Sequence, residues 1–412
     1  MKVLVIASTY PAPDNPQAGI FVHRQTVNLV RSGVECHVLA FRPAPPPFPK
    51  WLLRRSWINY FLKARSWPRE LDGVPVDVVF YERTWSKSED VVPAIGRALV
   101  EHVAARPDLQ RTDAVYAHWY WTSGASALAL RERFGWPVAA IARGSEMHDW
   151  HEVNAHCRPY VERVIREADV LLANCEHLRN RADEIVHGSA ERIEIVYNGC
   201  DAERFRPADD RNGVREGLGI RAHEKLLLFC GDVCARKGVL ELAQAWREFS
   251  GQHDGWRLCL VGQVIDPALA TELRRSGAEI LGRQSSDNVL RWMQAADAYI
   301  QPSRLEGLAN ATMEAMAVGL PVITTDTCGQ SELVRDGENG WLVPTSDIDG
   351  LARALAEMAA DPEGARAHGA AARATIVARF DPRVGAGRLA EALRRMVDRQ
   401  AVESAAVSKA TG

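Results

Sequence analysis

Two glutamates eight residues apart, Glu306 and Glu314, are the pair in this sequence best placed to do chemistry together. An apolar, strand-like run at 298–302 comes before them, and a helix-like run at 311–318 contains the second of them. Another apolar run follows at 321–326. The order strand, loop, helix and strand predicts a βαβ unit with Glu306 in its loop and Glu314 in its helix.

The loop of this unit is suited to binding phosphate. Unpaired backbone N–H groups and the helix dipole favour an anion at a helix start, here at Leu308, Ala309 and Asn310. We expect Asn310 to be the N-cap. Glu314 lies one turn further along the same helical face and could accept hydrogen bonds from ribose hydroxyls. Glu306 stands in the loop, where the group attached to the phosphates would lie. The alternative for both glutamates is a solvated surface carboxylate.

Length and composition limit the classes of protein to consider. A chain of 412 residues predicts two or three domains, each with its own core. The 50 Lys and Arg residues are nearly balanced by 53 Asp and Glu residues, so the chain is not a polycation and nucleic-acid binding is not expected. The eight scattered cysteines are typical of buried thiols in a reducing compartment. The first apolar run is too short for a signal sequence, and no run reaches the roughly 18 apolar residues of a membrane span.

The first half of the chain places several polar residues at expected strand ends. A strand at 2–7 leads through a Pro-rich loop to Gly19 and a helix. One later strand ends in His118. Another ends just before the turn Arg143-Gly144-Ser145-Glu146. Ligands of open α/β sheets bind at the carboxyl ends of strands, so these residues are placed to act. The alternative is that Gly19 only forms a turn and His118 is structural.

The second half opens in the same way, with a strand at 225–230 that leads to Gly231. The loop after it carries Arg236 and Lys237, and a helix follows. Asp232 in this loop would disfavour a nearby diphosphate, so we expect it to point away while Arg236 compensates. The two halves therefore repeat one architecture without obvious sequence identity.

Three further segments have a distinctive composition. Residues 48–69 interleave aromatic with basic residues, which suits an anionic membrane surface; the alternative is a packed helix and loop with a solvated basic face. His148, His151, His156 and Cys157 have no metal-binding spacing, so we expect a mobile, acceptor-facing loop rather than a metal site. Residues 401–412 are typical of a disordered tail.

Several of these segments together resemble the retaining nucleotide-sugar glycosyltransferases of family GT4. The resemblance rests on the two glutamates with the run at 314–322, the His118-Trp119 stretch, the Arg143 turn, Lys237 and the stretch at 197–201. It extends from the first strand to about residue 398. Such proteins have the α/β GT-B fold, two facing Rossmann-like domains with parallel sheets and a cleft between them. The resemblance implies a first domain over 1–207, with the helix at 383–400 crossing back to it, and a second over 208–382.

The resemblance also implies a reaction and the residues that perform it. A hexosyltransferase-type enzyme would move a sugar, with retention, from a nucleotide-diphosphate sugar to a hydroxyl of a lipid-linked or glycan acceptor in bacterial surface-polysaccharide synthesis. It would need no metal or other cofactor and would be cytoplasmic, with peripheral attachment to the inner face of the plasma membrane. The implied catalytic residues are His118, Glu306, Arg143 and Lys237. The implied donor-binding residues are Gly19, Gly231, Arg236, Lys237, Gly282, Arg283, Leu308, Ala309, Asn310 and Glu314, and Glu146, where the family usually has Asp, lies on the acceptor side.

Two other functions fit the same architecture. A sugar-nucleotide epimerase of this build would use a similar site without an acceptor. A binding protein would hold a ligand between two α/β domains without chemistry. The expected absence of an export signal and the combination of an acid with a lysine at the phosphate loop favour transfer over binding.

Overall fold

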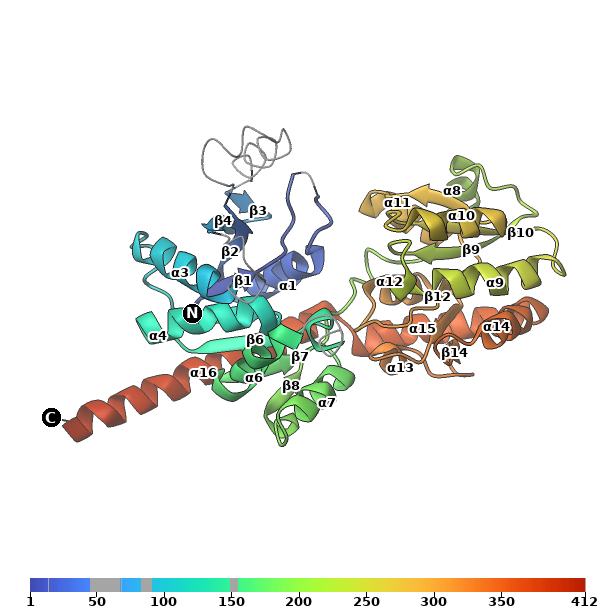
Figure 1. Cartoon of the computed structure of the whole chain (residues 1–412). Coiled ribbons are helices and arrows are strands. Elements are labelled where there is room, and N and C mark those ends of the chain that lie inside the picture. Colours follow the sequence, from blue (N-terminus) through green and yellow to red (C-terminus); the bar gives the residue numbers. More distant parts are fainter. Residues whose placement is uncertain (14, 45–66, 68, 83–90, 149–154, 412) are drawn as a thin grey trace. The chain divides into compact units, whose positions relative to one another are not determined.

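The computed structural model describes the chain except for residues 14, 45–66, 68, 83–90, 149–154 and 412. Its chain forms two compact units (Figure 1). Unit 1 comprises Met1–Val196 and Arg383–Gly412, and unit 2 comprises Tyr197–Pro382. Residues 197–207, which the sequence assigned to the first domain, belong to unit 2. The predicted membrane segment 48–69 lies outside the described residues except at Trp67 and Arg69.

Unit 1 is built on an eight-stranded sheet in the order β3-β4-β2-β1-β5-β6-β7-β8. The strands are β1 (Lys2–Ala7), β2 (Glu35–Pro43), β3 (Glu70–Leu71), β4 (Val74–Tyr81), β5 (Ala114–His118), β6 (Val138–Ala142), β7 (Val170–Ala173) and β8 (Ile193–Ile195). All neighbours pair in parallel except β3 and β4. The central strands are continuous apolar runs because helices cover both faces of a parallel sheet.

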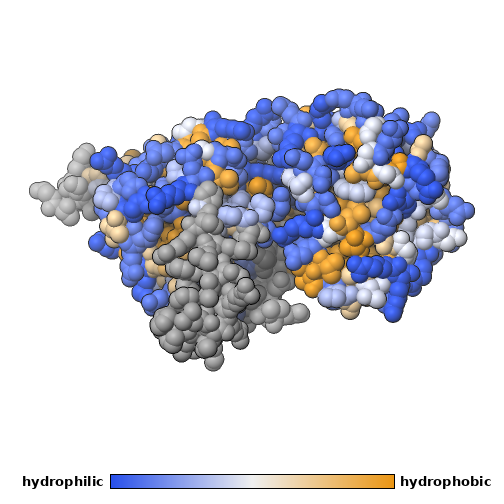
Figure 2. Space-filling view, turned by 90° about the horizontal axis from the view of Figure 1, so that it is seen from above, coloured by the Kyte–Doolittle hydropathy of each residue, from blue (hydrophilic) through white to orange (hydrophobic). Residues whose placement is uncertain are grey.

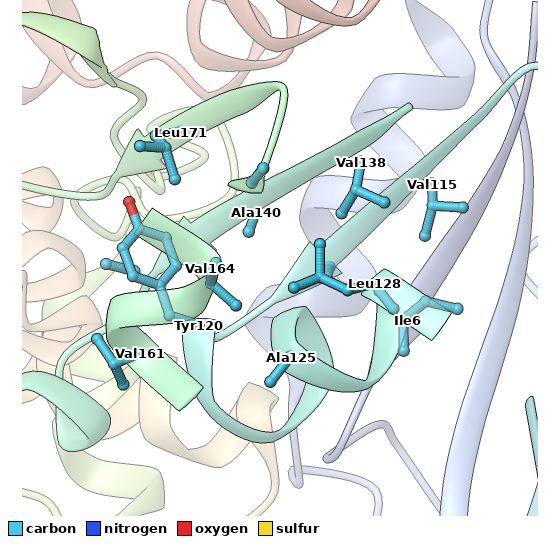
Figure 3. Close-up of a cluster of buried hydrophobic side chains, with 14 of the residues drawn as sticks. Ile6, Val115, Tyr120, Ala125, Leu128, Val138, Ala140, Val161, Val164 and Leu171 are labelled. Atoms are coloured by element: carbon cyan, nitrogen blue, oxygen red, sulfur yellow. The ribbon is translucent and has the colours of Figure 1, made fainter. Parts of the chain in front are cut away.

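The helices of unit 1 pack on these two faces. They are α1 (Ile20–Arg31), α3 (Val91–Ala104), a π-helical turn η3 (Tyr120–Gly124), α4 (Ala125–Phe134), α5 (Ser145–His148), α6 (Arg158–Glu167) and α7 (Glu176–Ile185), with short 3-10 turns at Ala155–Cys157 and Ala190–Arg192. Figure 3 shows strand residues such as Ile6 and Val138 facing Leu128 of α4 and Val164 of α6. A second apolar cluster covers the opposite face.

The last helix, α16 (Pro382–Thr411), belongs to unit 1 from Arg383 onward. Its Leu389, Leu393 and Met396 are buried in the cluster that contains β1 residues. The structure differs here from the sequence prediction of a disordered tail over 401–412, because the helix continues through Thr411. The added segment contains no Gly or Pro and is rich in Ala, so nothing in it ends a helix.

Unit 2 contains a six-stranded, all-parallel sheet in the order β11-β10-β9-β12-β13-β14. The strands are β9 (Lys225–Cys230), β10 (Trp256–Val261), β11 (Glu279–Gly282), β12 (Ala298–Gln301), β13 (Val322–Thr325) and β14 (Trp341–Val343). The helices are α8 (Arg211–Gly217), a 3-10 turn η6 (Ala235–Lys237), α9 (Val239–Ser250), α10 (Pro267–Arg275), α11 (Ser286–Ala295), α12 (Asn310–Val318), α13 (Gln330–Leu333), α14 (Ile348–Ala360) and α15 (Pro362–Arg379).

The described surface has no large apolar area that needs a place in the fold. On the face shown in Figure 2 the described surface is mostly hydrophilic, with smaller hydrophobic areas. In the described part of the chain, the exposed large apolar side chains are scattered: Val30 on α1, Ile265 before α10, Val377 on α15, and Val384 and Val402 on α16. Among the described residues, no helix is both long and apolar enough to cross a membrane.

Candidate functional site

The loop between β12 and α12 in unit 2 is held by buried hydrogen bonds. The Tyr299 hydroxyl donates to Gln301 Oε1 at 2.6 Å, and Gln301 Nε2 donates to Ser303 Oγ at 2.8 Å. On the neighbouring strand, Thr325 Oγ1 donates to the carbonyl oxygen of Ser303 at 2.5 Å. Because Tyr299, Gln301, Ser303 and Thr325 are all fully buried, these contacts fix the loop backbone before it reaches Glu306.

Glu306 is paired with the two cations that the sequence placed in the first loop of this unit. Lys237 Nζ lies 2.7 Å and Arg236 Nη1 lies 3.1 Å from Glu306 Oε2. Arg236 also donates to the carbonyl oxygen of Leu305 at 3.1 Å. Burial acts to raise the pKa of Glu306, but the charges and hydrogen bonds of Lys237 and Arg236 outweigh it, so that pKa lies below its ordinary value. Glu306 is therefore a carboxylate held against two cations.

Gly238 explains why the cation loop lies against the Glu306 loop. Its φ of +64° is left-handed, and a Cβ added there would stand 1.8 Å from the carbonyl oxygen of Pro302. The backbone N–H of Arg304 donates to the carbonyl oxygen of Arg236 at 2.9 Å. Only glycine allows this close approach of two backbones, and the approach brings Lys237 to Glu306.

The start of α12 differs in one detail from the prediction. The helix begins at Asn310 and its N-cap is Ala309, which has no side-chain cap. The Asn310 side chain instead accepts a hydrogen bond from Asn198 Nδ2 at 3.3 Å, so it is not the cap that the sequence predicted. Leu308 and Ala309 are buried.

Glu314 lies one turn further along α12 and is half-buried. Burial raises the pKa of the Cys230 thiol, and the Glu314 carboxylate adds to that effect. The same two causes contribute to the raised pKa of Tyr299. The Glu314 carboxylate is therefore within electrostatic reach of Cys230, the last residue of β9, and of Tyr299 in β12, and its role as a ribose-binding acid stays a prediction.

The remaining predicted donor residues of unit 2 lie at other strand ends. Gly231 follows β9, and its carbonyl oxygen approaches Gly262 so closely that a Cβ at Gly262 would stand 1.8 Å from it. Gly282 ends β11 with a φ of +70°, and exposed Arg283 donates to Gln263 Oε1 at 2.8 Å. Asp232 is exposed. The sheet order separates β11 from β9 by one strand.

In unit 1, Gly19 is the N-cap of α1, with a φ of +63°. A Cβ at this position would stand 2.3 Å from the carbonyl oxygen of Thr9. The packing of the loop on itself is thus sufficient reason for glycine here, whether or not the loop contacts a ligand.

His118 and Arg143 meet in a buried polar cluster of unit 1. Arg143 Nη2 lies 2.8 Å from His118 Nδ1 and also donates to Gln25 Oε1. The Tyr116 hydroxyl donates to the same Gln25 oxygen at 2.8 Å. The Phe21 ring covers the guanidinium of Arg143 at 5.5 Å. Burial, and then the charge of Arg143, hold the pKa of His118 well below its ordinary value.

Glu146 holds the turn that carries Arg143. Its Oε1 accepts from the backbone N–H of Arg143 at 2.8 Å, and its Oε2 accepts from that of Gly144 at 3.2 Å. Burial raises the pKa of Glu146 to about 7, although these backbone hydrogen bonds oppose the shift. Both carboxylate oxygens are thus engaged with the turn, and the acceptor-side role of Glu146 stays a prediction.

The backbone next to His118 is strained. Trp119 has a φ of +71°, which is uncommon for a residue with a Cβ and costs on the order of 1–3 kcal/mol. Its N–H donates to the carbonyl oxygen of Ile141, and its own carbonyl accepts from Gly124. Such strain often accompanies a functional position, where the surrounding structure holds the conformation.

The sequence alone did not identify several residues of these clusters. Tyr116 lies two residues before His118 on the same strand, so the period of two could have placed both on one face. Gln301 and Ser303 are polar residues at the end of an apolar strand, which is also a visible signal. Gln25 and Phe21 stand on a helix far from His118 in the sequence, and no local pattern connects them.

Two family models match successive parts of the chain. The model described as glycosyl transferases group 1 matches residues 210–375, and the model described as glycosyltransferase family 4 matches residues 18–204. The chain is 27% identical over 363 residues to the putative teichuronic acid biosynthesis glycosyltransferase TuaC of Bacillus subtilis, covering 87% of this chain and 88% of TuaC. It is 30% identical over 285 residues to the D-inositol 3-phosphate glycosyltransferase of Mycobacterium avium, covering 65% of this chain and 66% of that protein.

Solved structures resemble the chain over nearly its whole length. Sucrose-phosphate synthase from Thermosynechococcus elongatus has a TM-score of 0.76 at 19% identity and covers 97% of this chain and 100% of its own. HepE from Anabaena in complex with UDP-glucose has a TM-score of 0.71 at 18% identity and covers 96% and 100%. At these identities the likeness shows the fold.

Proposed function

The chain belongs to the GT4, or group 1, type of glycosyltransferases with the GT-B fold, and on that premise we propose that it transfers a sugar with retention of anomeric configuration. The donor is a nucleotide-diphosphate sugar, and the acceptor is a hydroxyl of a lipid-linked or glycan molecule in bacterial surface-polysaccharide synthesis. The donor class is supported by the UDP-glucose complex of the similar HepE, and the acceptor class by the name of TuaC.

One observation carries the donor proposal: Lys237 and Arg236 converge on Glu306 next to the loop that leads into α12. A diphosphate leaving group gains negative charge as the glycosidic bond breaks, and preorganised cations stabilise that charge. The amides at the start of α12 add partial positive charge to the same region. Glu306 keeps the two cations in place, and Glu314 accepts hydrogen bonds from the ribose.

These cations make a metal ion unnecessary in our proposal. Lys237 and Arg236 supply the positive charge that a divalent ion supplies in other enzymes that transfer diphosphate-linked groups. We therefore expect full activity in the presence of a chelator.

Unit 1 contributes His118 and Arg143 to the sugar in this proposal. Because the two side chains are buried and hydrogen-bonded to each other, they are suited to positioning the sugar rather than to carrying charge in the reaction. The acceptor attacks from the face that the diphosphate leaves, and the departing phosphate takes the acceptor proton. Attack on that face accounts for retention.

The experiment is an incubation with a panel of nucleotide sugars, UDP-glucose first, with and without lipid-linked or glycan acceptors. Free nucleotide released only when an acceptor is present supports transfer, and the anomeric configuration of the product by NMR tests retention. Lys237→Met should abolish most turnover, whereas Lys225→Met, at an exposed lysine that packs over Trp256, serves as the matched control. Formation of an epimer, or binding without turnover, would contradict the proposal.

Attachment to the inner face of the plasma membrane through residues 48–69 is a separate part of the proposal. It rests on the aromatic and basic composition of that segment. Sedimentation with liposomes tests it: preferential pelleting with anionic lipid is expected, and equal pelleting with neutral lipid would remove the electrostatic argument.

A further inference from the structure

We propose that Arg143 locks His118 as the neutral tautomer with its proton on Nε2, so that His118 is a hydrogen-bond donor to a substrate oxygen. In this proposal Gln25 and Tyr116 are positioning residues that hold Arg143 in place. The assignment of the tautomer rests on unit 1 alone. Its consequence for catalysis rests on the proposed glycosyl transfer.

The first step is the direction of the hydrogen bond between Arg143 and His118. A guanidinium has only donors, so the 2.8 Å contact with Arg143 Nη2 makes His118 Nδ1 the acceptor. In a neutral imidazole the other nitrogen then carries the proton. A doubly protonated ring would direct an N–H group at the guanidinium, which both sterics and charge oppose.

The second step is the orientation of the guanidinium. Gln25 Oε1 accepts from Arg143 Nη2 and from the Tyr116 hydroxyl. Burial raises the pKa of Tyr116 to about 12, although Arg143 opposes the shift, so the phenol keeps its proton and remains a donor. The two hydrogens of Nη2 thus have two acceptors, Gln25 and His118. Removing the Gln25 oxygen takes away one of the contacts that orient Arg143 Nη2 toward His118.

The charged and titratable groups around His118 agree with a neutral ring. Arg143 faces it from the turn after β6, and the Tyr116 ring lies on β5 with its centroid 4.7 Å from that of His118. From α1 the facing group is the neutral amide of Gln25. The Glu146 carboxylate acts on Arg143 and is bound to the backbone of its own turn. Burial and the Arg143 charge therefore both disfavour a proton on Nδ1.

The third step concerns the other ring nitrogen. His118 is fully buried, and in the described part of the chain its Nε2 has no hydrogen-bond partner. A buried donor left without an acceptor is unfavourable, and a ligand acceptor would remove that cost. The tautomer decides the class of that ligand atom: it must be an acceptor oxygen, such as a sugar hydroxyl. Because Nε2 is covered, the oxygen reaches it only after a neighbouring side chain moves.

The direct test is the protonation pattern of the His118 ring in the full-length protein labelled with ¹⁵N-histidine. The chain contains 12 histidines, and His118→Gln identifies the signal by its loss. Long-range ¹H–¹⁵N spectra should show a proton on Nε2 only, unchanged from pH 5 to pH 8. A proton on Nδ1, or a second proton gained near pH 6, would overturn the proposal.

Gln25 provides a matched pair of variants. Gln25→Leu removes the acceptor and should give mixed tautomers or a titrating ring, whereas Gln25→Glu keeps an acceptor oxygen and should keep the Nε2–H pattern. Both variants should be checked by thermal melting. If Gln25→Leu folds and its His118 signal is identical to that of the parent, Gln25 is not a positioning residue. Tyr116→Phe should weaken the lock less, because Gln25 remains.

Turnover separates this inference from the proposed function. With the donor identified by the nucleotide-sugar panel, Gln25→Leu should lower kcat by about 10-fold through misplacement of His118 and add a loss of rate between pH 7 and pH 5. Gln25→Glu should restore the flat pH profile. If no transfer occurs at all, the proposed function fails while the NMR result stands. Transfer together with an Nδ1–H ring overturns only the present inference.

Discussion

The first loops of the two units have the same local conformation but different contacts. Gly19 precedes α1 with a φ of +63°, and Gly238 precedes α9 with a φ of +64°. Gly19 approaches the carbonyl oxygen of Thr9 in its own loop, whereas Gly238 approaches that of Pro302 after β12. The loop of unit 1 therefore folds onto itself, while that of unit 2 is fastened to the loop of Glu306. The same backbone conformation thus packs one loop on itself in unit 1 and joins two loops in unit 2.

The polar clusters of the two units differ in what shifts the pKa values of their side chains. In unit 1, His118, Arg143 and Glu146 are all less than a tenth exposed, and burial is the largest cause of each pKa shift. In unit 2, Glu306 is 16% exposed, and its cations outweigh burial. The cluster around His118 therefore favours the neutral forms of His118 and Glu146, whereas the cluster around Glu306 favours a charged carboxylate.

The largest expected effect follows from Gly238→Ala. The added Cβ would meet the Pro302 carbonyl at 1.8 Å in a left-handed conformation, so we expect a loss of about 4 kcal/mol in the free energy of unfolding. Gly277→Ala is the control, because Gly277 has a φ of +86° and open space around its Cβ position, and should cost only about 1 kcal/mol. Equal denaturation midpoints for the two variants would refute the proposed fastening of the two loops.

The next effect is the pH dependence of stability that arises from Glu146. Its pKa rises from 4.5 to about 7 on folding, so the stability it contributes is fully present below pH 4.5 and is lost as pH rises through 7. The shift corresponds to about 3 kcal/mol. Glu146→Gln should remove this slope, as measured by urea unfolding at pH 5 and pH 8. Glu338→Gln, at an exposed ion pair with Arg335, should leave it unchanged.

Unit 2 should respond to pH in the opposite sense. The pKa of Glu306 lies below its ordinary value, so its stabilising contribution is present above about pH 4.5 and is lost as pH falls further. If Glu306→Gln altered stability mainly between pH 5 and pH 8, the contrast between the two units would be wrong.

Substitution of Glu306 and of Glu314 should affect different kinetic parameters. Glu306→Ala leaves Lys237 and Arg236 without their anchor, and we expect kcat to fall by about 100-fold with a smaller change in donor affinity. Glu314→Ala removes only the acid expected at the ribose, and should weaken donor binding by about 10-fold with little change in kcat. Steady-state kinetics and donor titration measure both. Unchanged kcat and affinity in both variants would show that the arrangement argued for α12 is incorrect.

The smallest effect concerns the support of the Glu306 loop. Thr325→Val removes the buried hydrogen bond to the Ser303 carbonyl, and should lower the free energy of unfolding by about 1 kcal/mol and turnover by a few fold. Thr271→Val, which removes a similar bond on the exposed side of α10, is the control and should leave turnover unchanged. A larger loss of turnover in the control would mean that the loop is not held in this way.

Local patterns in the sequence were sufficient for much of the fold. Continuous apolar runs ending in polar residues predicted the parallel strands, as at β1, β5 and β6, because burial on both faces leaves a direct trace in the sequence. The βαβ unit around Glu306 was also predicted, and the resemblance to GT4 proteins and the GT-B fold are confirmed. The structure differs from the sequence prediction at 401–411, because a polar segment rich in Ala and without Gly or Pro can still continue a helix.

The sequence by itself determined which residues stand at strand ends and loops, and with them the types of group offered to a ligand. Only the tertiary structure decided which of them touch: Lys237 with Glu306, Gln25 with Arg143, and Arg143 with His118. The physical reason is that local propensity acts over a few residues, whereas these contacts join positions 25 to 118 residues apart. Burial and partner charge, which set the pKa values, exist only once those distant segments have packed.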